Sequence, residues 1–466
     1  MAERAADEGT ALRTRPWHPN GIADTTLRVA ELPDKAVGIA LLGAGVVGRG
    51  VLKILDEQAE LLRRRTGLRP VVRHVVARNL ERHSDLADRH NVSTDAMAAV
   101  SDPGVSIVVE VMGGTGAAGE YVAAALKNGK HVVTANKALL ASDGPALFQL
   151  AKQYHVSIGF EASCGGGIPI IDALTRGLVG NRIDGLIGII NGTCNYILTQ
   201  MREHGQSYAD ALKGAQDVGF AEADPAMDVS GRDTAQKLAI LASLAFNEQV
   251  SEADILLSGI DTLDAKDIEN AGELGYAIKL LAIGERTLGG LALRVSPTLV
   301  HEHDLIADVS GGFNAISVYG HAIGHQFFYG RGAGQSPTAS AVVADILGVA
   351  MGTIPHAFER LNIYPGSLPA AKTLSHDDMV SRFYLRFTVQ DKPGVLAGIT
   401  ETLGDHGVSI QGLRQEETDT NEIVITTHET TRKAVTQAVA EIDALPTVRG
   451  ATVVWPIFDR PEEFGE

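Results

Sequence analysis

Residues 38–48 read GIALLGAGVVG, a short apolar run that passes directly into a glycine-rich turn. An apolar run without polar alternation is typical of a strand that is buried on both faces of a parallel sheet. The turn has the spacing G-x-G-x-x-G, and residues 51–65 after it have a helical pattern. A strand, a glycine turn and a helix in this order predict a dinucleotide-binding unit.

Each glycine of this turn has a physical task. Gly43 permits the tight turn, Gly45 lets a pyrophosphate approach the backbone, and Gly48 allows the helix to pack closely on the strand. The pyrophosphate would then meet the free N–H groups at the helix N-terminus. The same spacing also occurs in purely structural turns, but the flanking strand and helix favour dinucleotide binding here.

Strands and helices continue to alternate after the turn. Strands are predicted over residues 71–77, 107–111 and 131–134, with helical segments near Leu86 and over residues 119–128. This alternation predicts an α/β fold with a doubly wound parallel sheet of the Rossmann type over residues 36–160.

The end of the second predicted strand bears on the choice of cofactor. It reads Val76-Ala77-Arg78-Asn79, without the acid that commonly binds the ribose hydroxyl of NAD. Arg78 is placed to pair with a 2′-phosphate, which favours NADP over NAD. The alternative is an ordinary solvated arginine.

The rest of the chain divides by its pattern. Residues 161–345 mix helices and strands and predict an α+β domain, and residues 346–380 are interpreted as a connection. Residues 381–460 have the β-α-β-β-α-β order of a ferredoxin-like fold. Residues 1–35 are polar, have no sustained periodicity and contain Pro16, Pro19 and Pro33, which predicts a mobile extension.

Composition limits the class of protein. Hydrophobic residues make up 45% and charged residues 21%, and the formal net charge is −17. This acidity argues against nucleic acid or an anionic membrane as a partner. No apolar run approaches the roughly 18 residues of a membrane span, and the N-terminus lacks the apolar segment of a secretory signal. Two cysteines are too few for a disulfide framework. We therefore expect a cytoplasmic protein.

Candidate catalytic groups lie outside the glycine turn. Lys137 follows the predicted strand at residues 131–134, at the sheet edge where open α/β sheets bind ligands, although a plain surface lysine is equally compatible. Asp233 and Lys237 lie four residues apart on one face of a predicted helix. Because that helix is apolar nearly all round over residues 238–246, it is buried, and the pair borders a cleft rather than solvent. A lysine beside a carboxylate suits proton transfer.

Glycine is in excess, with 51 of 466 residues, against about 7% in an average protein. It gathers at residues 43–50, 113–119, 165–167 and 330–334. The second cluster, which includes Gly114, is expected at the cofactor cleft. Residues 161–169, EASCGGGIP, expose carbonyls beside a carboxylate, although from these residues alone a plain turn is favoured over a cation site. The last cluster precedes a predicted helix and suggests close approach of a ligand.

These stretches together resemble homoserine dehydrogenases over about residues 37–460. The resemblance rests on VVTANKALLA (132–141), EASCGGGIPII (161–171), GIINGTCNYIL (188–198), GFAEADPAMDVSGRDTAQKLAILA (219–242) and GRGAGQSPTASAVVADI (330–346). Residues 391–397, DKPGVLA, resemble the start of an ACT domain, a small regulatory module that binds amino acids. The family's second domain, here 161–345, usually binds substrate and dimerises, which implies a homodimer or homotetramer.

The resemblance implies reversible reduction of L-aspartate 4-semialdehyde to L-homoserine with NADP or NAD. Lys237 would donate the proton to the aldehyde oxygen, and Asp233 would orient it and help to hold substrate. Glu222 would bind the substrate amino group with support from Asp228, and Lys137 would lie between nicotinamide and substrate. The cofactor-binding residues would then be Gly43, Ala44, Gly45, Val46, Val47, Gly48, Arg78, Gly114, Lys137, Gly219 and Gly332.

The resemblance also implies a monovalent cation, usually sodium, at Glu161 with the carbonyls of Cys164, Gly166 and Ile168, and so favours this interpretation over a plain turn. It further implies feedback inhibition by L-threonine through residues 382–459. The sequence departs from the family pattern at Cys164, where valine is commoner, and at Cys194, where threonine is usual. Residues 1–35 have no counterpart.

Two alternatives remain. The chain could be another amino-acid or semialdehyde oxidoreductase, which residues 219–242 argue against. It could also be an amino-acid sensor that has lost catalysis, which the retained Asp233 and Lys237 argue against.

Overall fold

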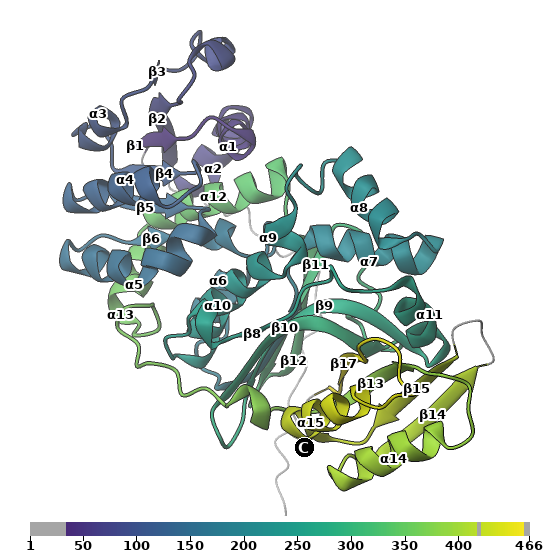
Figure 1. Ribbon diagram of the computed structural model, residues 1–466. Coiled ribbons are helices and arrows are strands. Elements are labelled where there is room, and N and C mark those ends of the chain that lie inside the picture. Colours follow the sequence, from purple (N-terminus) through teal and green to yellow (C-terminus); the bar gives the residue numbers. More distant parts are fainter. Residues whose placement is uncertain (1–33, 417–420, 461–466) are drawn as a thin grey trace, which may run out of the picture.

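The computed structural model describes residues 34–416 and 421–460. Nearly all of the expected mobile extension, residues 1–35, therefore lies outside the described residues. The described chain forms a nucleotide-binding unit, a central unit and a C-terminal unit, which follow one another from the upper left to the lower right of Figure 1.

The first unit is a parallel sheet in the order β3-β2-β1-β4-β5-β6. This confirms the predicted doubly wound α/β fold. Its strands are β1 (Lys35–Leu42), β2 (Leu68–Val76), β3 (Val92–Ser93), β4 (Ile107–Glu110), β5 (His131–Thr134) and β6 (Ile158–Gly159). Its helices are α1 (Val46–Glu57), α2 (Ala59–Thr66), α3 (Ala96–Ser101), α4 (Gly116–Lys127) and α5 (Lys137–Gln153), and the segment near Leu86 is a 3₁₀ turn, Glu81–Leu86.

The glycine turn joins β1 to α1 as its sequence predicts. Gly43 has a φ of 113°, in the region that favours glycine, and its N–H donates to the Val76 carbonyl. A Cβ on Gly48 would lie 2.0 Å from the Gly43 carbonyl oxygen, whereas a Cβ on Gly45 would meet nothing within 4 Å. Gly48 is therefore required for packing, and Gly45 leaves the turn open toward a ligand.

The central unit is a mixed sheet with helices on its flank. Its strands are β7 (Ile183–Ile189), β8 (Leu256–Leu257), β9 (Tyr276–Arg286), β10 (Leu291–His301), β11 (Phe313–Gly320) and β12 (Gly324–Arg331). Its helices are α6 (Ile170–Asp172), α7 (Gly192–His204), α8 (Tyr208–Asp217), α9 (Ala226–Val229), α10 (Arg232–Phe246) and α11 (Ala265–Glu273). The predicted buried helix is α10, in which residues 238–244 are all buried.

After β12 the chain returns to the first unit. Helix α12 (Gln335–Ala350) packs on α1, where Ala339, Val342 and Ile346 share one apolar cluster with Val51 and Leu52. It is followed by α13 (Thr353–Arg360). One continuous helix thus crosses residue 345, which is the predicted boundary between the α+β domain and the connection. Within the described residues, no single helix has the length and apolar character to cross a membrane, and α12 and α13 reach those limits only as a pair bent by 76°.

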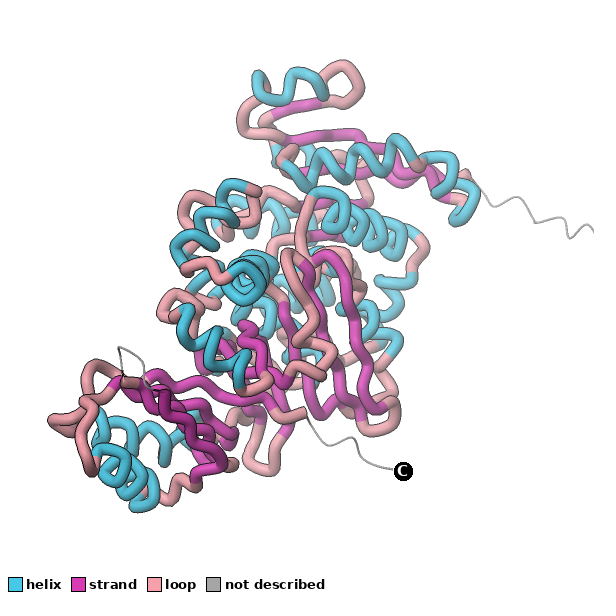
Figure 2. Tube along the Cα trace, turned by 90° about the vertical axis from the view of Figure 1, so that its right-hand side faces the viewer, coloured by secondary structure: helices cyan, strands magenta, loops and turns pink. Residues whose placement is uncertain are grey.

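The C-terminal unit has the predicted β-α-β-β-α-β order. It consists of β13 (Val380–Thr388), α14 (Val395–Asp405), β14 (Ile410–Glu416), β15 (Glu422–Thr427), α15 (Arg432–Asp443) and β17 (Val453–Phe458), and the short β16 (Thr430–Thr431) pairs with β13. Its antiparallel sheet runs β17-β13-β15-β14, with both helices on one face (Figure 2).

The C-terminal sheet is joined to the central sheet. Strand β17 pairs in parallel with β10 through Leu299 with Ile457 and Val300 with Phe458. The two sheets therefore form one continuous hydrogen-bonded surface. A change in the C-terminal unit can reach the central strands directly through this pairing.

Candidate active site

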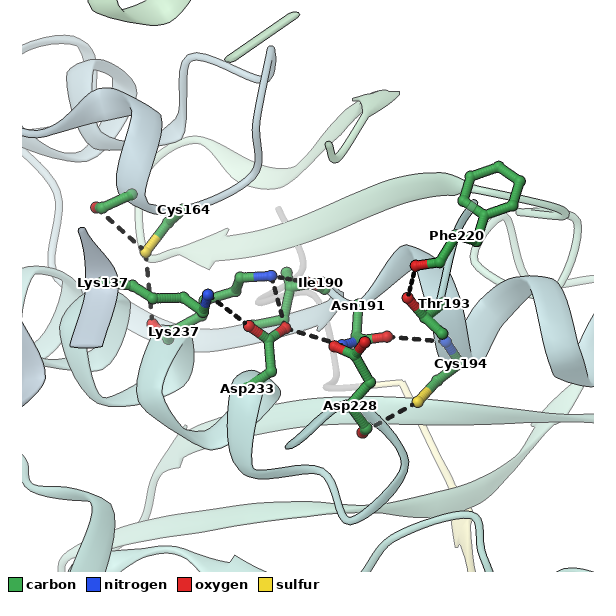
Figure 3. Close-up of polar contacts among 11 residues, drawn as sticks. Lys137, Cys164, Ile190, Asn191, Thr193, Cys194, Phe220, Asp228, Asp233 and Lys237 are labelled. Carbon is green, nitrogen blue, oxygen red and sulfur yellow. Dashed lines mark hydrogen bonds and ion pairs between the residues drawn. The ribbon is translucent and has the colours of Figure 1, made fainter. Parts of the chain in front are cut away.

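The carboxylate of Asp233 is the centre of a buried polar cluster (Figure 3). Asp233 lies in the first turn of α10 and is 5% exposed. Its Oδ2 accepts a hydrogen bond from Lys237 Nζ at 2.7 Å, and its Oδ1 lies 3.1 Å from Lys137 Nζ. Lys237 comes from the same helix, whereas Lys137 begins α5 of the first unit. The cluster therefore brings the nucleotide-binding and central units together.

Asn191 connects the cluster to a second carboxylate. Its side-chain oxygen accepts from the Cys194 N–H at 2.8 Å and so caps α7. Its Nδ2 donates to Asp233 Oδ2 and to Asp228 Oδ1, each at 2.8 Å. The N-cap thus fixes the direction in which the amide meets both acids.

The electrostatics keep Asp233 and Lys237 charged. Burial alone would raise the pKa of Asp233, but the ammonium groups of Lys237 and Lys137 lower it to about 2. Burial alone would lower the pKa of Lys237, but Asp233 raises it above its ordinary value. Burial raises the pKa of Asp228, and the nearby charge of Asp233 adds to this effect. Lys237 is therefore an ammonium group at neutral pH.

Lys237 also donates to the Ile190 carbonyl at 2.8 Å. A lysine ammonium has three N–H donors. Asp233 and Ile190 engage two of them, and no other described residue accepts a hydrogen bond from Lys237. One donor is left for a ligand.

Both cysteines are packed as protonated thiols. Burial raises the pKa of Cys164 to about 12 and also raises the pKa of Cys194. Cys194 Sγ donates to the Asp228 carbonyl at 3.2 Å. The thiol therefore makes the kind of contact that a threonine hydroxyl can make at the same position.

A large cavity of about 830 Å³ opens above the carboxyl ends of β1, β2 and β4. Its lining includes Gly43, Ala44, Gly45, Val46, Arg78 and Gly114 of the predicted cofactor-binding set. Arg49, Arg82 and His83 also line it, so its rim is basic despite the net charge of −17. Arg49 is paired with Asp85 at 2.6 Å, whereas the Arg78 side chain makes no hydrogen bond or ion pair to any described residue.

Other predicted cofactor residues lie outside this lining. Gly48 is covered by Gly43, and Val47 packs on the apolar cluster beneath the sheet. Gly332 is pressed against Asn314, since a Cβ there would lie 1.9 Å from Asn314 Nδ2. Gly219 is exposed in the loop after α8, and Lys137 lies at Asp233.

The residues predicted to bind substrate and cation occupy different surroundings. Glu222 is exposed, and within the described chain only its backbone carbonyl accepts a hydrogen bond, from Gln216. The Glu161 carboxylate is buried and accepts the N–H groups of Ile171 at 2.9 Å and Asp172 at 2.7 Å. Burial raises the pKa of Glu161 to about 7, although the two hydrogen bonds lower it.

Comparison with known proteins identifies the family. Residues 43–161 match the NAD-binding domain of homoserine dehydrogenase, residues 169–347 match homoserine dehydrogenase itself, and residues 383–447 match the ACT domain. The homoserine dehydrogenase of Neisseria gonorrhoeae is 43% identical over 420 residues, which cover 89% of this chain and 97% of that protein. The chain belongs to the homoserine dehydrogenase family. It is accordingly an NAD(P)-dependent oxidoreductase.

Solved homoserine dehydrogenases support the same assignment. The crystal structure from Thiobacillus denitrificans has a TM-score of 0.87 and 43% identity, and the match covers 92% of this chain and 99% of that one. A hyperthermophilic archaeal homoserine dehydrogenase in complex with NADPH has a TM-score of 0.58 and 26% identity, covering 68% of this chain and 98% of that one.

Sequence reasoning missed several residues of this homoserine dehydrogenase fold. Asn191 stands between an apolar strand and Gly192, a position typical of an N-cap, but its contacts to both acids depend on the tertiary structure. Glu110, fully buried, ends the apolar strand β4. It accepts from the N–H groups of Met112 and Gly113 and from the Thr134 hydroxyl. Glu110 therefore fixes the cavity loop after β4 relative to the strand that leads to Lys137.

We predict that Asn191→Ala lowers the free energy of unfolding by about 2–4 kcal/mol. The change removes a helix cap, and it takes one amide donor from the buried carboxylate of Asp233 and one from the half-buried carboxylate of Asp228. The matched control is Ser207→Ala, which removes the cap of α8 and an exposed hydrogen bond to Asp210, and which should lower the free energy of unfolding by about 1 kcal/mol. Denaturant unfolding of both variants measures the difference. An equal loss of stability in the two variants would show that the hydrogen bonds from Asn191 to Asp228 and Asp233 add nothing beyond capping.

Proposed function

We propose that this chain catalyses the reversible reduction of L-aspartate 4-semialdehyde to L-homoserine in the biosynthesis of threonine, methionine and isoleucine, with Lys237 as the proton donor. The observation that carries the proposal is the buried Lys237 ammonium, which keeps one N–H free while Asp233 and Ile190 hold the other two. Its position beside Lys137 places this donor next to the nucleotide-binding unit.

The cavity residues fit a nicotinamide dinucleotide. Gly45 leaves open space above the turn, and α1 begins at Val46 without a side-chain cap, so its N–H groups are available to a pyrophosphate. When bound, the nicotinamide would supply the hydride for the aldehyde carbon.

The chain's own residues would then handle the proton and the substrate. Lys237 donates its free N–H to the aldehyde oxygen as that oxygen gains charge, and in the reverse direction it takes the proton back. Asp233 holds the ammonium in place and keeps its pKa high. Lys137 contacts the other carboxylate oxygen of Asp233, and its side chain is 35% exposed, so it is available to the substrate.

The substrate amino group requires an acid, and Glu222 supplies one. Its carboxylate is exposed on the loop that joins α8 to α9 and makes no hydrogen bond or ion pair with any described residue. Asp228 lies between this loop and Asn191, where it can support binding of the ammonium. A zwitterionic substrate accounts for a site that combines these acids with two lysines.

The residues around Glu161 fit a monovalent cation through their carbonyl groups. The carbonyl oxygens of Cys164 and Gly166 accept no hydrogen bond from any described residue, and that of Ile168 accepts only the Ile170 N–H. Carbonyl oxygens are ligands for hard cations. Among the described residues no cluster of acidic, His or Cys side chains is placed to hold a metal. Sodium would therefore be held mainly by the loop backbone and would rigidify that loop.

Regulation and assembly complete the proposal. The ACT domain is a place for an amino-acid effector, and we propose that L-threonine acts through residues 382–459 as a feedback inhibitor. Pairing of central and ACT units would give a homodimer or homotetramer, which sedimentation analysis distinguishes.

Lys237→Ala should lower kcat by at least about 100-fold, since it removes the proton donor. The affinity for NADPH should stay within about twofold, because Lys237 does not line the cofactor cavity. The matched control is Lys279→Met, another buried lysine, which donates to the Val309 carbonyl. Steady-state kinetics with homoserine and a cofactor titration give both values. Wild-type turnover in Lys237→Ala would contradict the mechanism, and a wild-type protein without turnover would favour the sensor alternative.

Asp233→Asn should move the alkaline limb of the pH–rate profile, in the reductive direction, at least about one unit toward lower pH. Without the carboxylate, burial lowers the pKa of Lys237 with only weak opposition from its other neighbours, so the ammonium is lost at lower pH. Asp228→Asn is the control and should move the limb less, because Asp228 acts on Lys237 only weakly. An unmoved limb in Asp233→Asn would remove Asp233 as the source of the high pKa.

NADP is proposed as the preferred cofactor for two reasons: the Arg78 guanidinium at the cavity rim has no partner among the described residues, and the archaeal homoserine dehydrogenase was solved in complex with NADPH. Arg78→Gln should raise the KM for NADPH by about 10-fold or more. The KM for NADH in the same variant is the control and should not change. An equal rise in KM for NADPH and NADH would show that Arg78 does not contact a 2′-phosphate.

A further inference from the structure

A second cavity, of about 500 Å³, lies where the ACT unit meets the central unit. Its walls come from β8 and β10 of the central unit and from β13, α15 and β17 of the ACT unit. Among these, β10 pairs with both β8 and β17, and β17 pairs with β13. The size is within the range of small-molecule sites. Residues 391–397, which carry the ACT resemblance, do not line it.

Two buried donors in this wall have no partner within residues 34–416 and 421–460. Arg294, on β10, is 8% exposed, and its side chain makes no hydrogen bond or ion pair to any described residue. Trp455, on β17, is 7% exposed, and its indole N–H is likewise unpartnered among the described residues. Buried polar groups are nearly always paired, and a guanidinium and an N–H together suit a carboxylate.

The cavity is also lined by a carboxylate, whose charge is opposite to that of Arg294. Asp443, near the end of α15, lines the same cavity and accepts hydrogen bonds from Thr452. A carboxylate still has capacity for an ammonium group. Leu257, Met379 and Val439 provide apolar walls between the charged groups. The lining therefore matches a small molecule with one anionic end, one cationic end and a short side chain.

We propose that this cavity binds a free α-amino acid, with its carboxylate at Arg294 and Trp455 and its ammonium at Asp443. The inference rests on the proposed regulation through the ACT unit and gives that regulation a location. It places the effector between the ACT unit and the central unit, where a single molecule contacts both.

The cavity is connected to the catalytic helix. Leu257 lines the cavity, and a Cβ on Gly231, directly before α10, would meet Leu257 Cδ1 at 3.0 Å. The Ile260 N–H, just after β8, donates to the Val229 carbonyl at 2.8 Å. Strand β8 thus touches both the cavity and the segment that carries Asp228 and Asp233. Effector binding would act on the active site through this contiguous packing.

Isothermal titration of the full-length protein tests the proposal, with L-threonine, L-isoleucine, L-methionine and inorganic phosphate as probes. Arg294→Gln should weaken binding of the amino-acid effector at least about 10-fold, and Trp455→Phe, which removes one N–H, about three- to tenfold. Both should keep the wild-type kcat and KM without effector, since neither residue belongs to the catalytic cluster. Arg449→Gln, an exposed ACT arginine outside the cavity, is the matched control and should bind like wild type.

The outcomes separate this proposal from the wider function. If inhibition persists and both cavity variants bind the effector with wild-type affinity, the cavity proposal fails and ACT regulation stands; loss of binding in Asp391→Ala alone would then place the effector at residues 391–397. If the wild type binds none of the amino acids, both regulation and cavity proposal fail. Binding of phosphate alone would overturn the amino-acid assignment. Should Arg294→Gln fail to fold, Trp455→Phe still decides.

Discussion

The contact on which the site depends is the buried carboxylate of Asp233 between two ammonium groups, Lys237 and Lys137. Burial of charge is unfavourable unless every partner is in place, and removal of one partner is strongly destabilising. The cluster therefore requires that α5 of the nucleotide-binding unit and α10 of the central unit be held in a fixed relation. The same requirement fixes the distance between the cofactor cavity and Lys237, the proposed proton donor.

The supports of this cluster are mostly capping and strand-end contacts. Asn191 directs its amide to both acids because its oxygen caps α7. On the other side, Asn136 caps α5 through the Leu139 N–H and donates to the Gly114 carbonyl at the cofactor cavity. Glu110 accepts hydrogen bonds from the Met112 N–H and the Thr134 hydroxyl, and so ties the loop after β4 to the end of β5. The residues that position Lys137 therefore also shape the cavity.

Several parts of the fold and of the candidate site could be predicted from patterns within short segments of the sequence. The glycine turn and the buried helix α10 follow from local spacing, and the four-residue separation of Asp233 and Lys237 predicts their shared face. The contact of Lys137 with Asp233 could not be predicted, because it joins segments almost 100 residues apart in a fold that no local pattern specifies. The return of α12 to α1 and the pairing of β17 with β10 are also long-range. Their patterns show only that each element has an apolar face, not which surface covers it.

Glycine packing links the remaining parts of the site. A Cβ on Gly166 would lie 2.4 Å from the Gly332 carbonyl, so glycine at residue 166 is what lets the two loops approach closely. The second loop leads into α12, whose Gln335 donates to the Val46 carbonyl in the cofactor turn at 3.1 Å. Asp345 of α12 in turn accepts the Glu161 N–H at 2.8 Å. If the proposed cation orders the 161–168 loop, its effect would reach the cofactor turn through α12. The short distance between the two glycine-rich loops makes this route possible.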